Sequence, residues 1–154
     1  MITAATREWR VEMGEVRVRL VLSNYEDEGM VCRGLLRADQ VRRAEVDALV
    51  DTGATRLVLP KSIADQLGLR VLGKLPVRYA DERRGVCDRV GIVVVGLMGR
   101  TTEVDAVVEP QKTYALLGQI PLEGLDLFVD PVGRRLVPNP DSPDAPLSEM
   151  QGSL

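Results

Sequence analysis

The chain has 154 residues, close to the size of one ordinary domain, so its length supports one sizeable core rather than two. Hydrophobic residues make up 45% and aromatic residues only 3%, so the core must be aliphatic, which favours sheet. The absence of histidine excludes Ser-His-Asp and Cys-His catalysis, HExxH zinc sites and histidine pH switches. If the chain is an enzyme, carboxylates are the expected reagents, and no metal or organic cofactor is implied.

Charge and cysteine usage predict a cytoplasmic protein that binds neither nucleic acid nor membrane. The net charge of −3 comes entirely from the segment 138–154, and a neutral body attracts neither nucleic acid nor an anionic membrane. The longest apolar stretch, residues 91–99, is too short to span a bilayer, and charges interrupt the N-terminus where a signal peptide needs an apolar run. Cys32 and Cys87 fit no CxxC or zinc motif and are expected to be free thiols.

The first third of the chain is predicted to consist of strands that lead into an aspartate. Residues 15–22 alternate apolar and charged side chains, as in a half-buried strand. A turn is expected over 24–29, and further strands over 31–37 and 41–50. The last strand ends in an apolar Ala-Leu-Val run, which we expect to be buried on both faces and to deliver Asp51 into a turn.

One helix and several hairpins are expected after the aspartate. Residues 56–60 are predicted to form a short strand, and residues 60–69 the one helix of the chain, which stops at Gly68. Strands over 75–80 and 85–96 flank a charged tip, with Gly85 expected in a left-handed bulge position. Further strands are expected over 93–95, 103–108 and 114–118, and a last hairpin turns at 130–133.

The domain organisation expected from these patterns is simple. One domain covers residues 1–137, and residues 138–154 hold four of the nine prolines together with aspartate and serine. Such a composition cannot build a core, so we expect a solvated Pro/Asp-rich tail unless a partner holds it.

The stretch Ala-Leu-Val-Asp-Thr-Gly-Ala-Thr, residues 48–55, carries the most informative chemistry. Asp-Thr-Gly is ordinary turn chemistry, so a purely structural role is one interpretation. Turn aspartates normally have polar neighbours, however, whereas Asp51 follows Leu49 and Val50 and precedes the apolar run 57–59. This apolar setting favours a functional carboxylate.

Three features, in this order, resemble the retropepsin-like aspartic proteases, which include the retroviral proteases and single-domain cellular and bacterial proteins. Residues 51–54 resemble the catalytic loop of that family. The hairpin around 81–85 stands where the family has its substrate-covering flap, and residues 116–118 resemble the apolar-apolar-glycine element that crosses behind the loop. The resemblance covers roughly residues 45–130. It implies an all-β fold, a closed β-barrel half with one short helix, that forms a two-fold dimer.

The resemblance also implies a role for each residue of these three features. Asp51 is the catalytic acid/base, Thr52 reaches across to the partner subunit, Gly53 allows the close turn, and Ala54 accompanies the carboxylate. The supporting element behind the loop is Leu116, Leu117 and Gly118. The substrate-binding residues of the flap are Tyr79, Asp81, Glu82, Arg83, Arg84 and Gly85, although Tyr79 has packing on the core as an equal alternative.

A single Asp-Thr-Gly supplies half of a catalytic dyad. In proteases of the retroviral type, each of two identical subunits supplies one aspartate at a two-fold axis. The resemblance therefore implies a homodimeric endopeptidase acting on a peptide or protein substrate, in which one carboxylate activates water while its protonated partner binds the carbonyl oxygen.

Two departures from the family pattern support a different function. Many viral members continue the apolar-apolar-glycine element with an arginine and an Asn or Asp, whereas this chain has Gln119, Ile120 and Pro121. The flap tip, glycine-rich in viral enzymes, is charged here. The alternative hypothesis is a catalytically inactive retropepsin-like module that dimerises or binds peptides.

Overall fold

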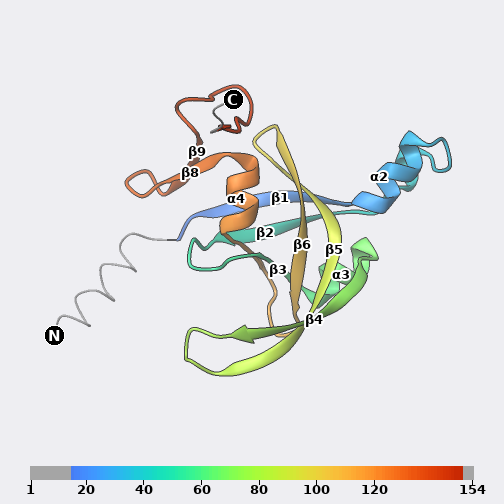
Figure 1. The fold of residues 1–154 in the computed structure, drawn as a ribbon, viewed down its shortest axis with the longest axis horizontal. Coiled ribbons are helices and arrows are strands. Elements are labelled where there is room, and N and C mark those ends of the chain that lie inside the picture. The colour runs from blue at the N-terminus through green and yellow to red at the C-terminus, as the bar shows by residue number, and fades with distance from the viewer. Residues whose placement is uncertain (1–14, 151–154) are drawn as a thin grey trace.

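The computed structural model describes residues 15–150 as a β-barrel with short helices (Figure 1). Its strands are β1 (Arg17–Asn24), β2 (Arg43–Val50), β3 (Leu57–Pro60), β4 (Arg70–Arg78), β5 (Arg84–Leu97), β6 (Arg100–Glu109), β7 (Ala115–Leu117), β8 (Leu127–Asp130) and β9 (Arg135–Pro138). Its helices are α2 (Tyr25–Cys32), a 3-10 turn (Ala38–Gln40), α3 (Lys61–Leu67) and α4 (Gln119–Leu125).

Seven of these strands form one sheet, in the order β1-β2-β7-β3-β6-β5-β4. The additional antiparallel pairing of β1 with β5 closes six of the strands into a barrel, and β4 is attached outside it through β5. The all-β barrel expected from the sequence is therefore confirmed. No helix in the part of the chain that the structure describes is long and apolar enough to cross a membrane.

The barrel interior is aliphatic, as the composition requires. Alternate residues of each strand point inward, so that Leu57 and Leu59 of β3 are completely buried while Val58 between them is half-buried. Leu20, Leu22, Leu67 and Leu117 are also fully buried, and they belong to strands and a helix far apart in sequence. This core holds the ends of β2, β3 and β7 in fixed positions.

Residues 15–150 contain three α-helices, whereas the sequence predicts one. The helix expected over 60–69 is confirmed as α3, which ends at Gly68 in the left-handed conformation (φ 61°). The turn expected over 24–29 and the strand expected over 31–37 are wrong, because α2 occupies Tyr25–Cys32. The third helix, α4, begins directly after Gly118.

Polar contacts rather than an apolar face explain α2. The side chain of Asn24 caps the helix by accepting a hydrogen bond from the Asp27 amide, and the first turn is acidic. The Asp27 carboxylate is buried and receives both Nε and Nη2 of Arg42, at 2.8 and 2.9 Å. Such partners are invisible to a search for hydrophobic periodicity.

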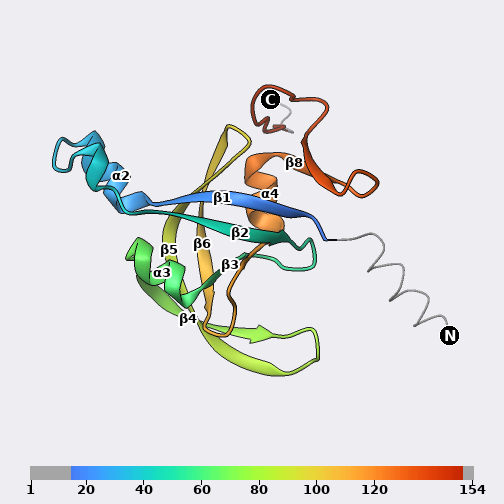
Figure 2. The same cartoon turned by 180° about the vertical axis from the view of Figure 1, so that it is seen from behind.

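The β4–β5 hairpin confirms the predicted flap strands, with one correction at its tip. The residue with positive φ is Glu82 (φ 68°), not Gly85. The Tyr79 amide donates to the Arg83 carbonyl at 2.8 Å, and the Asp81 side chain accepts from the Arg83 amide. In Figures 1 and 2 this tip and the β2–β3 loop lie at the end of the molecule opposite α2.

Most residues of the segment after β9 are exposed, but Ser142 is buried and the segment makes long-range hydrogen bonds. The buried Arg100 guanidinium donates to the carbonyl oxygens of Asp126 and Ser142. The Asp126 carboxylate in turn accepts from Asn139, from the Ser142 hydroxyl and from the Leu147 amide. These hydrogen bonds fix the segment against the end of α4, and they hold the pKa of Asp126 below its usual value, the Ser142 hydroxyl being the main cause.

Candidate active site

Asp51 stands in a tight loop between β2 and β3, where the sequence analysis places the catalytic residue. The loop is closed by a hydrogen bond from the Ala54 amide to the Asp51 carbonyl at 3.1 Å. Thr52 and Gly53 are exposed, while Asp51 and Ala54 are half-buried. The carboxyl group is therefore presented at the surface by the end of β2, where Leu49 and Val50 are half-buried rather than buried on both faces as expected.

The strand β7 crosses directly behind this loop. It pairs in parallel with β2, Leu49 facing Leu116, and antiparallel with β3 through Val58 and Leu116. The Asp51 amide donates to the Leu117 carbonyl at 3.0 Å. The chain entering the loop and the chain leaving it are thus both paired with one short strand, β7.

Gly118 permits the closest approach in the site. A Cβ atom at this position would lie 2.3 Å from the Arg56 carbonyl oxygen and 2.7 Å from the Ala54 carbonyl oxygen. The next two amides, of Gln119 and Ile120, donate to the carbonyls of Ala54 and Thr55 at 2.8 and 2.9 Å. The first turn of α4 is therefore attached to the catalytic loop.

The Asp51 carboxyl group is held by one oxygen and leaves the other available. Its Oδ1 accepts the Gly53 amide at 2.9 Å, a short-range bond that orients the side chain. Within residues 15–150, Oδ2 has no hydrogen-bonding partner, and neither has the Thr52 hydroxyl. Both groups are thus available to a water molecule, a substrate or a second subunit.

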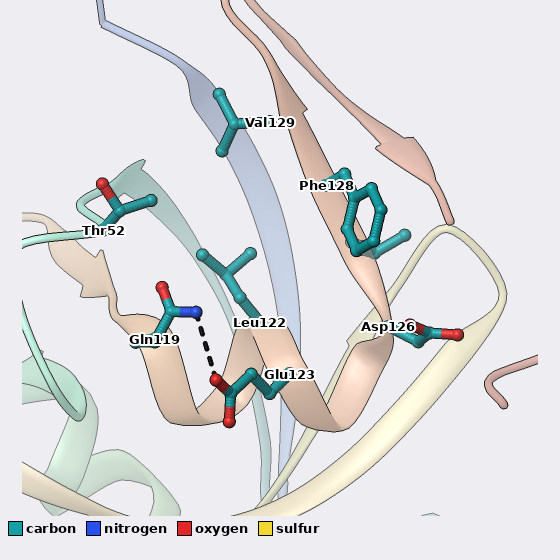
Figure 3. A pocket seen from close by; sticks show the side chains of 8 residues that line it. Thr52, Gln119, Leu122, Glu123, Asp126, Phe128 and Val129 are labelled. Carbon is teal, nitrogen blue, oxygen red and sulfur yellow. Dashed lines mark hydrogen bonds between the residues drawn. The ribbon is translucent and has the colours of Figure 1, made fainter. Parts of the chain in front are cut away.

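A groove of about 410 Å³ begins at Thr52 and continues over α4 to β8 (Figure 3). Thr52 stands on one side and Phe128 on the other, with Gln119 and Leu122 of α4 between them. The side-chain amide of Gln119 donates to the Glu123 carboxylate at 3.2 Å, one turn along the helix. Gln119 thus pairs within its own helix, where viral relatives have the arginine discussed above.

Tyr79 is the flap residue with the most contacts. Its hydroxyl donates to the buried Glu109 carboxylate at 2.9 Å and lies 3.7 Å from the Cys87 sulfur. These two groups, the thiol first, raise the pKa of Tyr79 to about 12. The Arg83 guanidinium lies over the Tyr79 ring, 4.6 Å from its centroid. Tyr79 therefore joins the tip of the flap hairpin to Glu109 at the end of β6 through polar contacts.

The remaining predicted flap residues lie at the exposed tip. Asp81, Glu82, Arg83 and Arg84 are all exposed, and loose ion pairs join Arg78 to Glu82 and Arg83 to Asp81. Gly85 lies against the Tyr79 ring. The structure brings these residues together in one hairpin, which is separate from the loop of Asp51.

Three polar residues that the sequence analysis did not single out as site residues lie beside the loop. Arg56, two residues after Ala54, donates to both oxygens of Asp105 at 3.0 and 2.9 Å, and Arg89 donates to the same carboxylate at 3.0 Å. The proximity of Arg56 to the loop was visible in the sequence, but its partner Asp105 is 49 positions away. Among residues 15–150, no group of three or more His, Cys, Asp or Glu side chains could hold a metal ion.

Comparison with known proteins identifies the class to which this fold and site belong. Residues 40–123 match the family model described as gag-polyprotein putative aspartyl protease, a range that includes the loop of Asp51, the flap and Gly118. The chain belongs to this family and has the fold of the retropepsin-like aspartic proteases. No curated protein matches the chain.

Solved structures with a similar fold include cellular and viral proteins. The retroviral protease-like domain of Ddi1 from Leishmania major is 20% identical, with a TM-score of 0.45 over 66% of this chain and 79% of that one. The protease of simian foamy virus (mac) is 19% identical, with a TM-score of 0.40 over 51% and 80%. The EIAV protease, in complex with the inhibitor HBY-793, is 20% identical, with a TM-score of 0.40 over 51% and 75%.

Proposed function

We propose that the chain is an aspartic endopeptidase that hydrolyses peptide bonds with one Asp51 from each subunit of a homodimer. The observation that carries the proposal is the loop itself: a carboxylate oriented by the Gly53 amide, with one oxygen unpaired within residues 15–150, on a loop fastened from behind by β7. Family membership supports aspartic protease-type function independently of this geometry.

The chemistry requires two carboxyl groups that share one proton. The ionised carboxylate takes a proton from water, which attacks the peptide carbonyl carbon. The protonated carboxyl group donates a hydrogen bond to the carbonyl oxygen and the proton is later delivered to the leaving nitrogen. One chain supplies one such group, so a second copy completes the pair.

The groove beside Thr52 supports a two-fold assembly of this kind. If two Asp51 carboxyl groups meet at a two-fold axis, the exposed residues next to Asp51 must face the partner. Thr52 is continuous with an apolar surface on β8 that includes Phe128, whose side chain is 49% exposed. Burial of this ring in a partner groove gives the dimer an apolar contact.

The test is Asp51→Asn assayed on an unfolded protein substrate. The substitution keeps the shape of the side chain and removes its titrating group, so cleavage should be abolished while the fold is retained. Asp47→Asn is the matched control, because Asp47 lies on the same strand but is exposed and paired with Arg19. Activity of Asp51→Asn close to that of the unchanged protein contradicts the proposal.

The composition of the flap tip favours the second candidate, an inactive module that dimerises or binds peptides. Residues 81–84 contain no glycine, so this tip has less backbone freedom than a glycine-rich one. This candidate is supported if the dimer forms and binds peptides but shows no cleavage dependent on Asp51. The free thiols of Cys32 and Cys87 agree with a reducing compartment, so we propose a cytoplasmic location.

A further inference from the structure

Arg56, Asp105 and Arg89 form a cluster with two positive charges and one negative charge. Arg56 uses a single nitrogen, Nη1, for both of its hydrogen bonds to Asp105, and Arg89 also uses only its Nη1. The two arginine side chains are 32% and 33% exposed, whereas that of Asp105 is 18% exposed. Each guanidinium therefore keeps further N–H donors facing solvent, beside a carboxylate that is already shared.

The strand registers place this cluster on the outer face of the barrel, the face to which Leu116 of β7 also belongs. Arg56 and Asp105 each come one residue before the fully buried pair Leu57 and Ala106, so they point away from the barrel interior. Arg89 pairs with Val107, which also faces away from the interior.

The same face continues to Asp51. Val58 pairs with Val107 on one side and with Leu116 on the other, and Leu116 pairs with Leu49. Leu49 precedes Asp51 by two residues. A row of apolar residues that point away from the barrel interior, three of them half-buried and Val107 buried, thus leads from the cluster to the catalytic loop.

The geometry points to the Arg56–Asp105–Arg89 cluster as a subsite for an acidic side chain of the peptide, close to the bond that is cut. This inference rests on the proposed function and names a substrate class for it: peptides with an Asp or Glu flanked by apolar residues. Asp105 positions the two guanidinium groups, and their unused donors bind the substrate carboxylate. Charge-assisted hydrogen bonds of this type are about twice as strong as neutral ones.

Arg19 is an arginine that we do not expect to bind a substrate carboxylate, because its own ion pairs already neutralise its charge. Arg19 faces two carboxylates, Glu45 and Asp47, so its charge is more than compensated. Its side chain is 56% exposed on the outer surface of β1 and β2. Arg19→Gln is therefore a control that removes an ion-paired arginine without touching the cluster.

The experiment measures peptide binding to the Asp51→Asn protein, so that its outcome does not depend on cleavage. The probes are fluorescent decapeptides of apolar residues, identical except for one Glu or one Gln placed at each position in turn. We expect one position at which Glu binds about 10-fold more tightly than Gln, measured by fluorescence anisotropy. Raising the salt concentration should reduce this preference.

Variants decide whether the cluster causes the preference. In Arg56→Gln and in Arg89→Gln the Glu-to-Gln ratio should fall to about 1, in Arg56→Lys it should be partly retained, and in Arg19→Gln it should be unchanged. Circular dichroism checks that each variant is folded. If Arg56→Gln does not fold, Arg89→Gln provides the test of the cluster. Equal binding of Glu and Gln peptides at every position, absence of peptide binding, or a preference that survives in a folded Arg56→Gln or Arg89→Gln protein overturns the inference. Failure of the proposed function shows separately, as absence of cleavage by the protein with Asp51.

Discussion

Gly118→Ala tests whether the attachment of β7 and α4 to the catalytic loop determines the stability of the fold. The backbone of Gly118 has φ −86°, which alanine adopts without strain, so the effect is a contact effect. The new Cβ would lie 2.3 Å from the Arg56 carbonyl oxygen and 2.7 Å from the Ala54 carbonyl oxygen. Both obstacles are backbone atoms, which cannot rotate away as a side chain does.

The size of the effect follows from what must move. Overpacking costs about 1–3 kcal/mol, and displacing α4 weakens two backbone hydrogen bonds, from Gln119 to Ala54 and from Ile120 to Thr55, worth about 1 kcal/mol each. Alanine recovers about 0.7 kcal/mol through the unfolded chain. We therefore expect a loss of about 3 kcal/mol in the free energy of unfolding.

Urea unfolding at a fixed protein concentration measures this loss. With a slope of about 2 kcal/mol per M, the midpoint should fall by roughly 1.5 M. Gly29→Ala in α2 is the control, because a Cβ there has no atom within 4 Å, and it should stabilise the protein by about 0.5–1 kcal/mol. If Gly118→Ala is as stable as Gly29→Ala, the interpretation of the crossing is wrong.

Three further predictions concern assembly and pH. Phe128→Asp should convert the dimer to a monomer in sedimentation at micromolar concentration. Leu35→Asp should leave the dimer intact, because Leu35 is 69% exposed and follows α2, which lies at the other end of the molecule. If both variants are dimeric, the assigned surface is wrong. Excess Asp51→Asn subunits should poison the activity of unchanged subunits, and activity per subunit that is constant on mixing and dilution would exclude a shared site. Arg42 lowers the pKa of Asp27, mainly through its hydrogen bonds to that carboxylate. The ionised carboxylate therefore stabilises the fold fully above its unfolded pKa of about 3.9. This stabilisation is lost as the pH falls through the lower pKa of the folded state. Asp27→Asn should thus cost about 2 kcal/mol at pH 7 and clearly less at pH 3 in urea unfolding; an equal cost at both values would contradict the ion pair.

Features that depend on neighbouring residues were predictable from the sequence. The loop of Asp51, the two hairpins and α3 each follow from an alternation of side chains or from a turn signal within about ten residues. The same local chemistry failed at α2, whose stability comes from the Asn24 cap and the buried pair of Asp27 with Arg42. It also failed at Glu82, where the hydrogen bonds of the turn place the left-handed residue three positions earlier than expected.

By itself, the sequence determined which carboxylate enters a tight turn at the end of a strand, because strand alternation and Asp-Thr-Gly turn chemistry are local properties. Only the tertiary structure decided what surrounds that carboxylate. The passage of β7 between β2 and β3 explains why residue 118 has no side chain, and it depends on a pairing between segments more than 60 positions apart. The contact of Arg56 with Asp105, the contact of Tyr79 with Glu109 and the groove from Thr52 to Phe128 are likewise long-range. Their partners are chosen by the register of the closed barrel, which no local pattern specifies.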